Sequence, residues 1–333
     1  MKTSTYLLLF IGLGLFTILV GYHGVTDVAA ALAVAGWGLI WVALFRLIPM
    51  GFNTVAWRIL LDEDERPSFK TMLWARWIGE SVKGLLPVAQ VGGDLVKARL
   101  IAQRGLPTAV AGASVVIEMT VSVVTQIIFT LIGVGLLLGI GAPKVVTPIL
   151  ISLGVMGLLV AGFYLVQRRG LFGKIVGVLN RLAGDRAWQL PVGEAIALDD
   201  TIKRMYRNRY ALFLSFFWRL LGWIVGAGEV WLALYFLDAP TTLSTALLLE
   251  SLGQAVRSAA FLIPGAVGVQ EGGYLLLGGL VGLSPEVALA LSLTKRVRML
   301  VLGLPGLIDW QIAEGQRLRR LQNRQHVESQ IPS

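Results

Sequence analysis

Charged side chains recur inside long apolar stretches of this 333-residue sequence. An ionised group among apolar neighbours costs several kcal/mol unless it is paired or has a role. Acids and bases are both present, so ion pairs can form, and arginine offers a planar fork that fits a phosphate group. The candidate binding or gating residues are Glu80, Lys83, Asp94, Lys97, Arg99, Glu118, Arg257, Glu271, Lys295, Arg296 and Arg298.

Glycine and proline interrupt the apolar pattern twice, in 72–90 and in 246–283. Half-helices that meet at a break, or short helices that enter a membrane and turn back, explain these segments better than simple spans. A broken backbone survives at membrane depth only where protein or a water-filled cavity covers it. A glycine-rich break also frees backbone N–H groups that attract an anion. The predicted backbone breaks are Pro87, Gly92, Gly93, Pro264, Gly265 and Gly268.

The sequence favours binding over covalent chemistry. It has no cysteine and two histidines far apart, His23 and His326, so we expect no metal centre. It contains no nucleophile elbow, zinc-protease motif or phosphate-binding loop, and we expect no catalytic residue and no cofactor. One alternative is a membrane enzyme that uses Glu80, Asp94 or Glu118 as acid or base. Another alternative is that the protein is a non-catalytic partner of a lipid-synthesis complex and docks through 167–209.

The composition places these charges in a membrane. Hydrophobic residues make up 56% of the chain and charged residues only 15%, and the mean hydropathy is +0.73. Ordinary soluble domains carry about 25% charged residues. We therefore expect an all-α polytopic membrane protein with six to eight transmembrane helices, and the bound group is then a lipid headgroup. The apolar runs lie at 6–20, 29–49, 109–140, 145–166, 211–237 and 286–312.

The distribution of Lys and Arg predicts the topology. The net charge is +9, and 167–209 alone holds nine basic and four acidic residues. The positive-inside rule places both termini, 50–108 and 167–209 in the cytoplasm, with 53–76 read as a loop. Most tryptophans flank apolar runs and are expected to anchor at the interface. The basic excess is topogenic, so we expect no nucleic-acid partner, and the predicted location is a bacterial inner membrane.

The two broken segments match each other at a constant offset. Aligning 87–118 with 264–295 without a gap pairs Asp94 with Glu271, and Glu118 with Lys295. Extended upstream, the alignment pairs Glu80 with Arg257. Three predicted crossings separate the copies, and an odd number inverts the second, as in many transporters. We expect one domain over 1–315, with repeats around 72–140 and 246–312, and a basic tail over 316–333. The swapped signs predict ion pairs between the halves, Glu80 with Arg257 and Glu118 with Lys295.

The motifs around both breaks resemble the flippase-like family, also called the lysylphosphatidylglycerol synthase transmembrane region. The resemblance rests on Leu86-Pro87, Gly92–Arg99, Gly105, Ala109, Val115–Glu118, Ile263–Gly265, Gly268–Glu271 and Arg296. It implies an inner-membrane domain that moves or presents lipids across the bilayer, with anionic, modified or hopanoid-type lipids and lipid-biosynthesis enzymes as partners.

Two features separate this sequence from the best-known members. In those members the membrane domain is fused to an aminoacyl-transferase, which these 333 residues do not include, so lipid aminoacylation is not expected of them. Met119 stands where members often have arginine. This difference does not favour binding of the same lipid headgroup as in those members. The chain is also similar to members associated with hopanoid biosynthesis.

Overall fold

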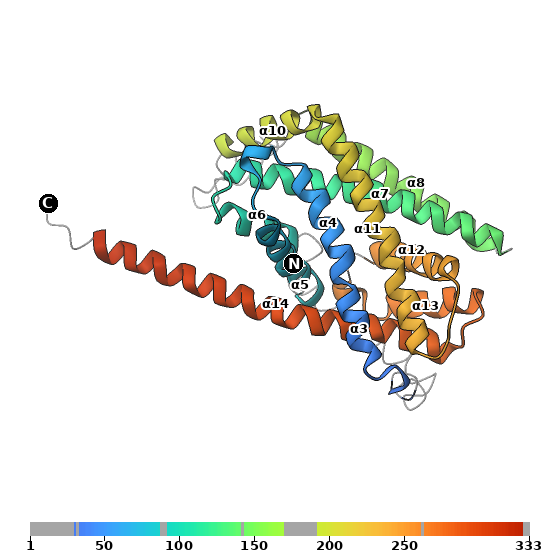
Figure 1. Cartoon of the computed structure of the whole chain (residues 1–333). Coiled ribbons are helices and arrows are strands. Elements are labelled where there is room, and N and C mark those ends of the chain that lie inside the picture. The colour runs from blue at the N-terminus through green and yellow to red at the C-terminus, as the bar shows by residue number, and fades with distance from the viewer. Residues whose placement is uncertain are drawn as a thin grey trace.

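The protein is all-α in the part of the chain described by the computed structural model, namely residues 30, 33–86, 92–140, 143–169, 192–260 and 263–328. Eleven α-helices and two short 3-10 helices occur there (Figure 1), which confirms the predicted fold class. The elements are α3 (Gly38–Phe45), α4 (Leu47–Ile59), η1 (Glu63–Glu65), α5 (Phe69–Leu85), α6 (Gly92–Ala102), α7 (Thr108–Gly139), α8 (Pro143–Arg168), α10 (Val192–Arg207), α11 (Arg209–Phe236), α12 (Leu243–Ala259), η3 (Pro264–Ala266), α13 (Val269–Leu280) and α14 (Pro285–Glu328).

Three helical stretches are long and apolar enough to cross a membrane: Gly38–Ile59, formed by α3 and α4, and the helices α7 and α11. The last two confirm the runs predicted at 109–140 and 211–237. The helices α8 and α14 cover the runs at 145–166 and 286–312. The run at 6–20 lies outside the described residues.

The predicted span at 29–49 and the predicted loop at 53–76 are wrong in their limits. The helical stretch continues to Ile59, and α5 already begins at Phe69, so only a short connection separates them. The helix passes through the polar pair Asn53 and Thr54 because the Thr54 hydroxyl donates to the carbonyl of Met50 within the same helix, at 2.8 Å. Hydropathy alone ends a run at such residues, whereas the helix does not.

The outer surfaces of the bundle are apolar. Leu158 and Leu159 on α8, and Phe213 on α11, are all exposed. On α14, exposed side chains recur every three to four residues, which places them on one face of the helix. These α14 residues are Leu300, Val301, Leu304, Ile308 and Ile312. A large exposed apolar surface of this kind suits contact with lipid.

Both predicted breaks separate two shorter helices. The helix α5 ends at Leu85 and α6 begins at Gly92, while α12 ends at Ala259 and α13 begins at Val269. Pro87 lies outside the described residues. In the second break Gly265 and Gly268 have φ values of +63° and +78°, a region that favours glycine. The glycines therefore allow the chain to turn sharply between α12 and α13.

The helices on either side of the breaks recur with a regular spacing. The helices α6 and α13 begin at residues 92 and 269, and α7 and α14 begin at 108 and 285, both 177 apart. The helices α5 and α12 have 17 residues each but begin at 69 and 243, 174 apart. The second break is thus three residues longer than the first. The gapless alignment matches Glu80 with Arg257, whereas counting from the helix starts matches Lys83 with Arg257 and Arg76 with Glu250.

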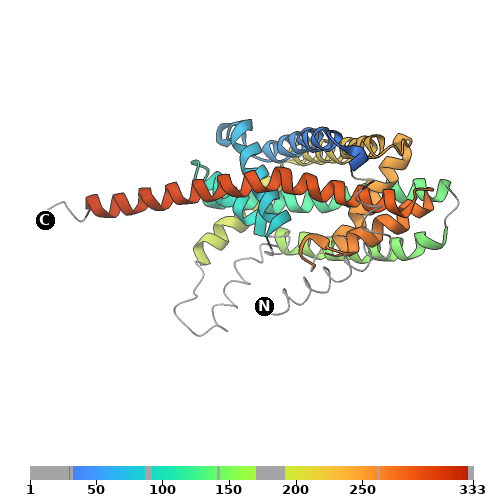
Figure 2. The ribbon, with the colours of Figure 1, turned by 90° about the horizontal axis from the view of Figure 1, so that it is seen from below.

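The helices around the first break (α5, α6 and α7) and those around the second break (α12, α13 and α14) pack against each other crosswise, so that a helix of one group contacts a helix of the other. The helix α5 packs on α14, α12 packs on α7, and α4 packs along α11. Close approaches of Gly38 to Phe236 and of Gly222 to Asn53 show that α3–α4 and α11 run antiparallel. Figure 2 shows these helices together along one face of the bundle, while the C-terminal part of α14 extends away from it. The crosswise packing brings polar positions of both groups into the interior.

Candidate functional site

Ion pairs run through the interior of the helix bundle, and we call their members the buried charge network. Its acids are Glu80, Asp94, Glu118, Glu229, Glu250 and Glu271. Its cations are Arg46, Arg76, Lys97, Arg219, Lys295, Arg296 and Arg298. Within the described residues no group of His, Asp or Glu side chains is arranged to hold a metal ion. The acids face cations instead.

Glu118 on α7 is the centre of the first part of this network. Its carboxylate accepts hydrogen bonds from Arg76 Nη2 at 2.6 Å, Lys97 Nζ at 2.7 Å and Arg219 Nη1 at 2.9 Å. These cations come from α5, α6 and α11, and only 4% of the Glu118 side chain is exposed. Lys97 also pairs with Asp94 at 2.7 Å. One carboxylate therefore joins four helices.

Trp57 packs against two of the cations that bind Glu118. Its ring lies 5.5 Å from the Arg76 guanidinium and 5.2 Å from Lys97 Nζ, within the range of cation–π attraction. Its indole N–H donates to Ser114 Oγ at 3.1 Å, and the side chain is fully buried. The prediction that tryptophans anchor at the interface is therefore wrong for Trp57. It packs in the core because its one polar atom has a partner there.

The acids of the second part are each held by a separate cation. Glu271 at the start of α13 accepts from Arg296 Nε at 2.6 Å and Nη2 at 3.0 Å, and also from Ser292 Oγ and the backbone N–H of Gly268. Lys295 pairs with Glu250. By helix position Glu250–Lys295 corresponds to Arg76–Glu118 with the signs exchanged. Counted from the helix starts, the two interhelical ion pairs thus have opposite polarity.

Glu229 on α11 is held much less tightly. Arg298 Nε lies 3.1 Å and Arg46 Nη1 lies 3.8 Å from its oxygens, yet neither oxygen makes a hydrogen bond and the side chain is buried. Arg46 also lies 3.6 Å from Glu80, which in turn lies 3.9 Å from Arg76. Arg46 therefore connects the two parts of the network through long, non-ideal contacts.

Two cations at the ends of the broken helices have no carboxylate within 4.0 Å among the described residues. Lys83 is in the last turn of α5 and its side chain is exposed. Arg257 is in the last turn of α12, half-buried, and its Nη2 lies 4.0 Å from the sulfur of Met299. With them the region holds nine cations and six acids. Lys83 is exposed, so eight of the nine cations are buried or half-buried, and they still outnumber the six acids.

The structure brings together most of the residues predicted from the sequence, though with different partners. Two of the predicted residues, Glu271 and Arg296, pair directly with each other. The cross-pairs Glu80–Arg257 and Glu118–Lys295 are wrong. Glu80 lies near Arg46 and Arg76 instead, and Glu118 pairs with Arg76, Lys97 and Arg219. Sequence reasoning missed Arg46, Arg76 and Arg219. The available signal was that Arg46 and Arg219 each interrupt an apolar run.

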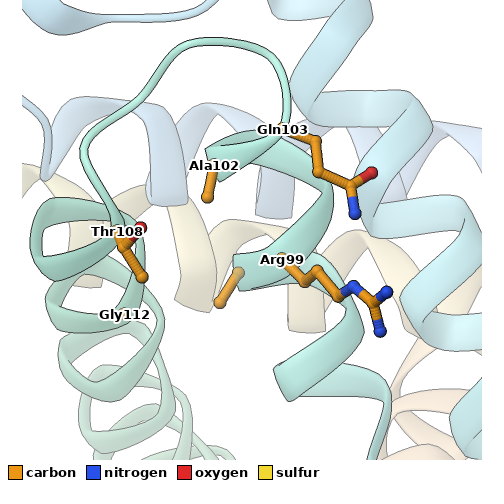
Figure 3. A pocket seen from close by; sticks show the side chains of 6 residues that line it. Arg99, Ala102, Gln103, Thr108 and Gly112 are labelled. Carbon is orange, nitrogen blue, oxygen red and sulfur yellow. The ribbon is translucent and has the colours of Figure 1, made fainter. Parts of the chain in front are cut away.

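Arg99 lies apart from the network. It pairs with Glu314 at 2.5 Å, and 54% of its side chain is exposed. Beside it, α6 and α7 border a hollow of about 410 Å³ (Figure 3), whose floor is formed by small side chains. The lining residues are Ala98, Arg99, Ala102, Gln103, Thr108 and Gly112. None of these six residues is a member of the network, so the hollow and the charges are separate features.

Apolar helices around a buried charge network define a multi-pass membrane protein. The family model of the lysylphosphatidylglycerol synthase TM region matches residues 8–306, and the chain belongs to this family. The match covers both broken segments and every acid of the network. No curated protein and no solved structure matches the chain.

Proposed function

We propose that the protein moves a lipid with an anionic headgroup from one leaflet of the bilayer to the other, without changing it covalently. The observation that carries this proposal is the positive excess of this region, nine cations against six acids, with eight of the cations buried or half-buried. An unbalanced buried cation is costly, and a phosphate group offsets that cost by charge-assisted hydrogen bonds. The apolar outer faces would meanwhile leave the acyl chains in the membrane.

We propose that the helices form an inverted repeat, in which one half opens the lipid path toward each leaflet. The equal spacing of α6–α7 and α13–α14, and the crosswise packing of α5 on α14 and of α12 on α7, support such a repeat. The broken helices α5–α6 and α12–α13 would then be re-entrant elements that open toward opposite leaflets. In this arrangement both termini and 167–209 face the cytoplasm of a bacterial cell, and the protein lies in the inner membrane.

The topology is testable because the chain has no cysteine, so any introduced thiol is unique. We expect Gln103→Cys, between α6 and α7, to react with a membrane-impermeant maleimide only after the membrane is opened. Ser244→Cys, at the start of α12, should react in intact spheroplasts. Labelling of both residues from the same side would contradict the inverted arrangement.

Transport is tested in liposomes that contain the full chain and a fluorescent phospholipid, with a quencher that reaches only the outer leaflet. We expect the folded protein to expose inner-leaflet lipid to the quencher, and Lys295→Gln to slow this at least about tenfold. Lys70→Gln is the matched control, because Lys70 is an exposed lysine of α5 outside the network. Equal rates for the wild type and Lys295→Gln, with both folded, would contradict the proposed path.

The lipid itself is identified by repeating the assay with several headgroups. The panel contains phosphatidylglycerol, its lysyl ester, phosphatidylethanolamine and a hopanoid-type lipid. Mass spectrometry of the recovered lipids separates transport from the alternative of a membrane enzyme. We expect lipids of unchanged mass, and a new covalent product that needs Glu118 or Asp94 would favour the enzyme.

A further inference from the structure

The two cations without an acidic partner occupy the same place in two helices of equal length. Lys83 and Arg257 are each the third residue from the end of a 17-residue helix, α5 and α12 respectively. Each of these helices is the one that precedes a break. The seven other cations of the region all have a carboxylate within 4.0 Å. Lys83 and Arg257 are thus the cations of this region left available for an added anion.

Glycines pack closely next to both cations. A Cβ on Gly93 would lie 2.9 Å from Cβ of Lys83 and would also meet the backbone of Gly79. A Cβ on Gly84 would lie 3.0 Å from the sulfur of Met299, and Arg257 Nη2 lies 4.0 Å from the same sulfur. Both positions therefore lie in close packing between helices, and among the described residues neither charged group has a carboxylate within 4.0 Å.

We infer that Lys83 and Arg257 form two separate phosphate-binding sites, one at each break, each taking the phosphate group of a lipid headgroup. This inference rests on the proposed function and adds the residues that receive the substrate. A lysine ammonium binds phosphate as a point charge, whereas the arginine fork binds two phosphate oxygens at once. The cations of the network are poorer candidates, since a phosphate would have to displace the carboxylate that each already faces.

The neighbourhood of Arg257 favours a lipid over free phosphate. Leu300 and Val301, in the same turn of α14 as Met299, expose 46% and 51% of their surface. A phosphate at Arg257 would therefore lie close to an apolar outer face, along which acyl chains can run. A free phosphate ion would gain nothing from that face.

The test measures binding and not transport. Native mass spectrometry of the full chain in detergent counts bound phosphatidylglycerol, with diacylglycerol as the analogue that lacks phosphate. We expect two phosphatidylglycerol molecules that diacylglycerol does not replace. Lys83→Gln and Arg257→Gln should each weaken one of them by about tenfold or more, because a hydrogen bond to a charged group is worth about 1.5–3 kcal/mol. The double variant should weaken both.

Matched control variants test whether the loss of lipid binding is specific to Lys83 and Arg257. Lys70→Gln and Arg204→Gln make the same chemical changes at exposed positions outside the region and should bind as the wild type does. Lys83→Arg, which keeps the charge, should restore binding. Unchanged binding in the double variant, or an equal loss in the controls, would overturn the inference.

The last experiment measures the binding of inorganic phosphate in place of the lipid. Saturation of both sites by millimolar inorganic phosphate, with no preference for the lipid, would assign them to the free ion and overturn the lipid part of the inference. If the two sites bind lipid as expected while liposomes show no leaflet exchange, the proposed function fails and the binding sites stand. The two failures are therefore distinguishable.

Discussion

In the group formed by α5, α6 and α7 the single carboxylate of Glu118 gathers three cations, whereas in the group formed by α12, α13 and α14 Glu250 and Glu271 each have a cation of their own. The first arrangement is a hub, and its three hydrogen bonds of 2.6 to 2.9 Å tie α7 to α5, α6 and α11. The second is a set of separate pairs.

The difference has a mechanical meaning. Breaking a hub requires several short, charge-assisted hydrogen bonds to be lost together, while separate pairs can open one at a time. Glu229, next to the second set, makes no hydrogen bond at all through its carboxylate. We therefore expect the first group to act as the fixed part of the bundle and the second as the part that rearranges.

The largest effect is expected from Glu118→Gln. The substitution leaves Arg76, Lys97 and Arg219 around a neutral amide, and removing one partner from a buried ion pair costs about 3–5 kcal/mol. The free energy of unfolding in detergent should fall by that amount. Glu63→Gln, on an exposed 3-10 helix, is the control and should change it little. A loss of less than about 1 kcal/mol for Glu118→Gln would show that the hub does not hold the first group together.

The next effect separates a hub from a pair. Lys295→Met alone leaves Glu250 buried without its cation and should cost about 3 kcal/mol. Adding Glu250→Leu should recover most of that loss, because a buried ion pair replaced by apolar side chains is often neutral in stability. A double-mutant cycle measures the recovery.

The same rescue should fail at Glu118. Glu118→Leu with Arg76→Leu leaves Lys97 and Arg219 still charged and facing an apolar group, so its cost should stay near that of the single variant. Rescue at both places would mean that the two groups hold their charges alike, and the contrast between them would be lost.

Much of this architecture could be predicted from the sequence. The limits of α7 and α11 follow from apolar runs, and both breaks follow from glycine and proline. The partners of Glu118 could not be predicted, because Arg76, Lys97 and Arg219 come from three different helices that only the packing of the bundle brings together. The correspondence of Lys83 with Arg257 was also hidden. The three extra residues of the second break shift the register by almost one helical turn, which the gapless alignment cannot represent.

A smaller effect is expected from Glu229→Gln. Its carboxylate is attracted by Arg298 and Arg46 but makes no hydrogen bond, so the neutral amide should cost only about 1 kcal/mol in the free energy of unfolding. Leaflet exchange should change more than stability does, since Arg298 would lose its one ion pair among the described residues and Arg46 would be left with Glu80 alone. A cost equal to that of Glu118→Gln would place Glu229 in a second hub and contradict the mobile role of this group.

The smallest effect is expected from Arg99→Ala, which tests where the site ends. Arg99 and Glu314 form a partly exposed pair, and such pairs contribute about 0–1 kcal/mol because water already solvates both charges. We expect a change below about 0.5 kcal/mol in the free energy of unfolding and the wild-type rate of leaflet exchange. A tenfold slower exchange in folded Arg99→Ala would instead extend the lipid path from the network to the hollow between α6 and α7. The first group of helices would then move lipid as well as brace the bundle.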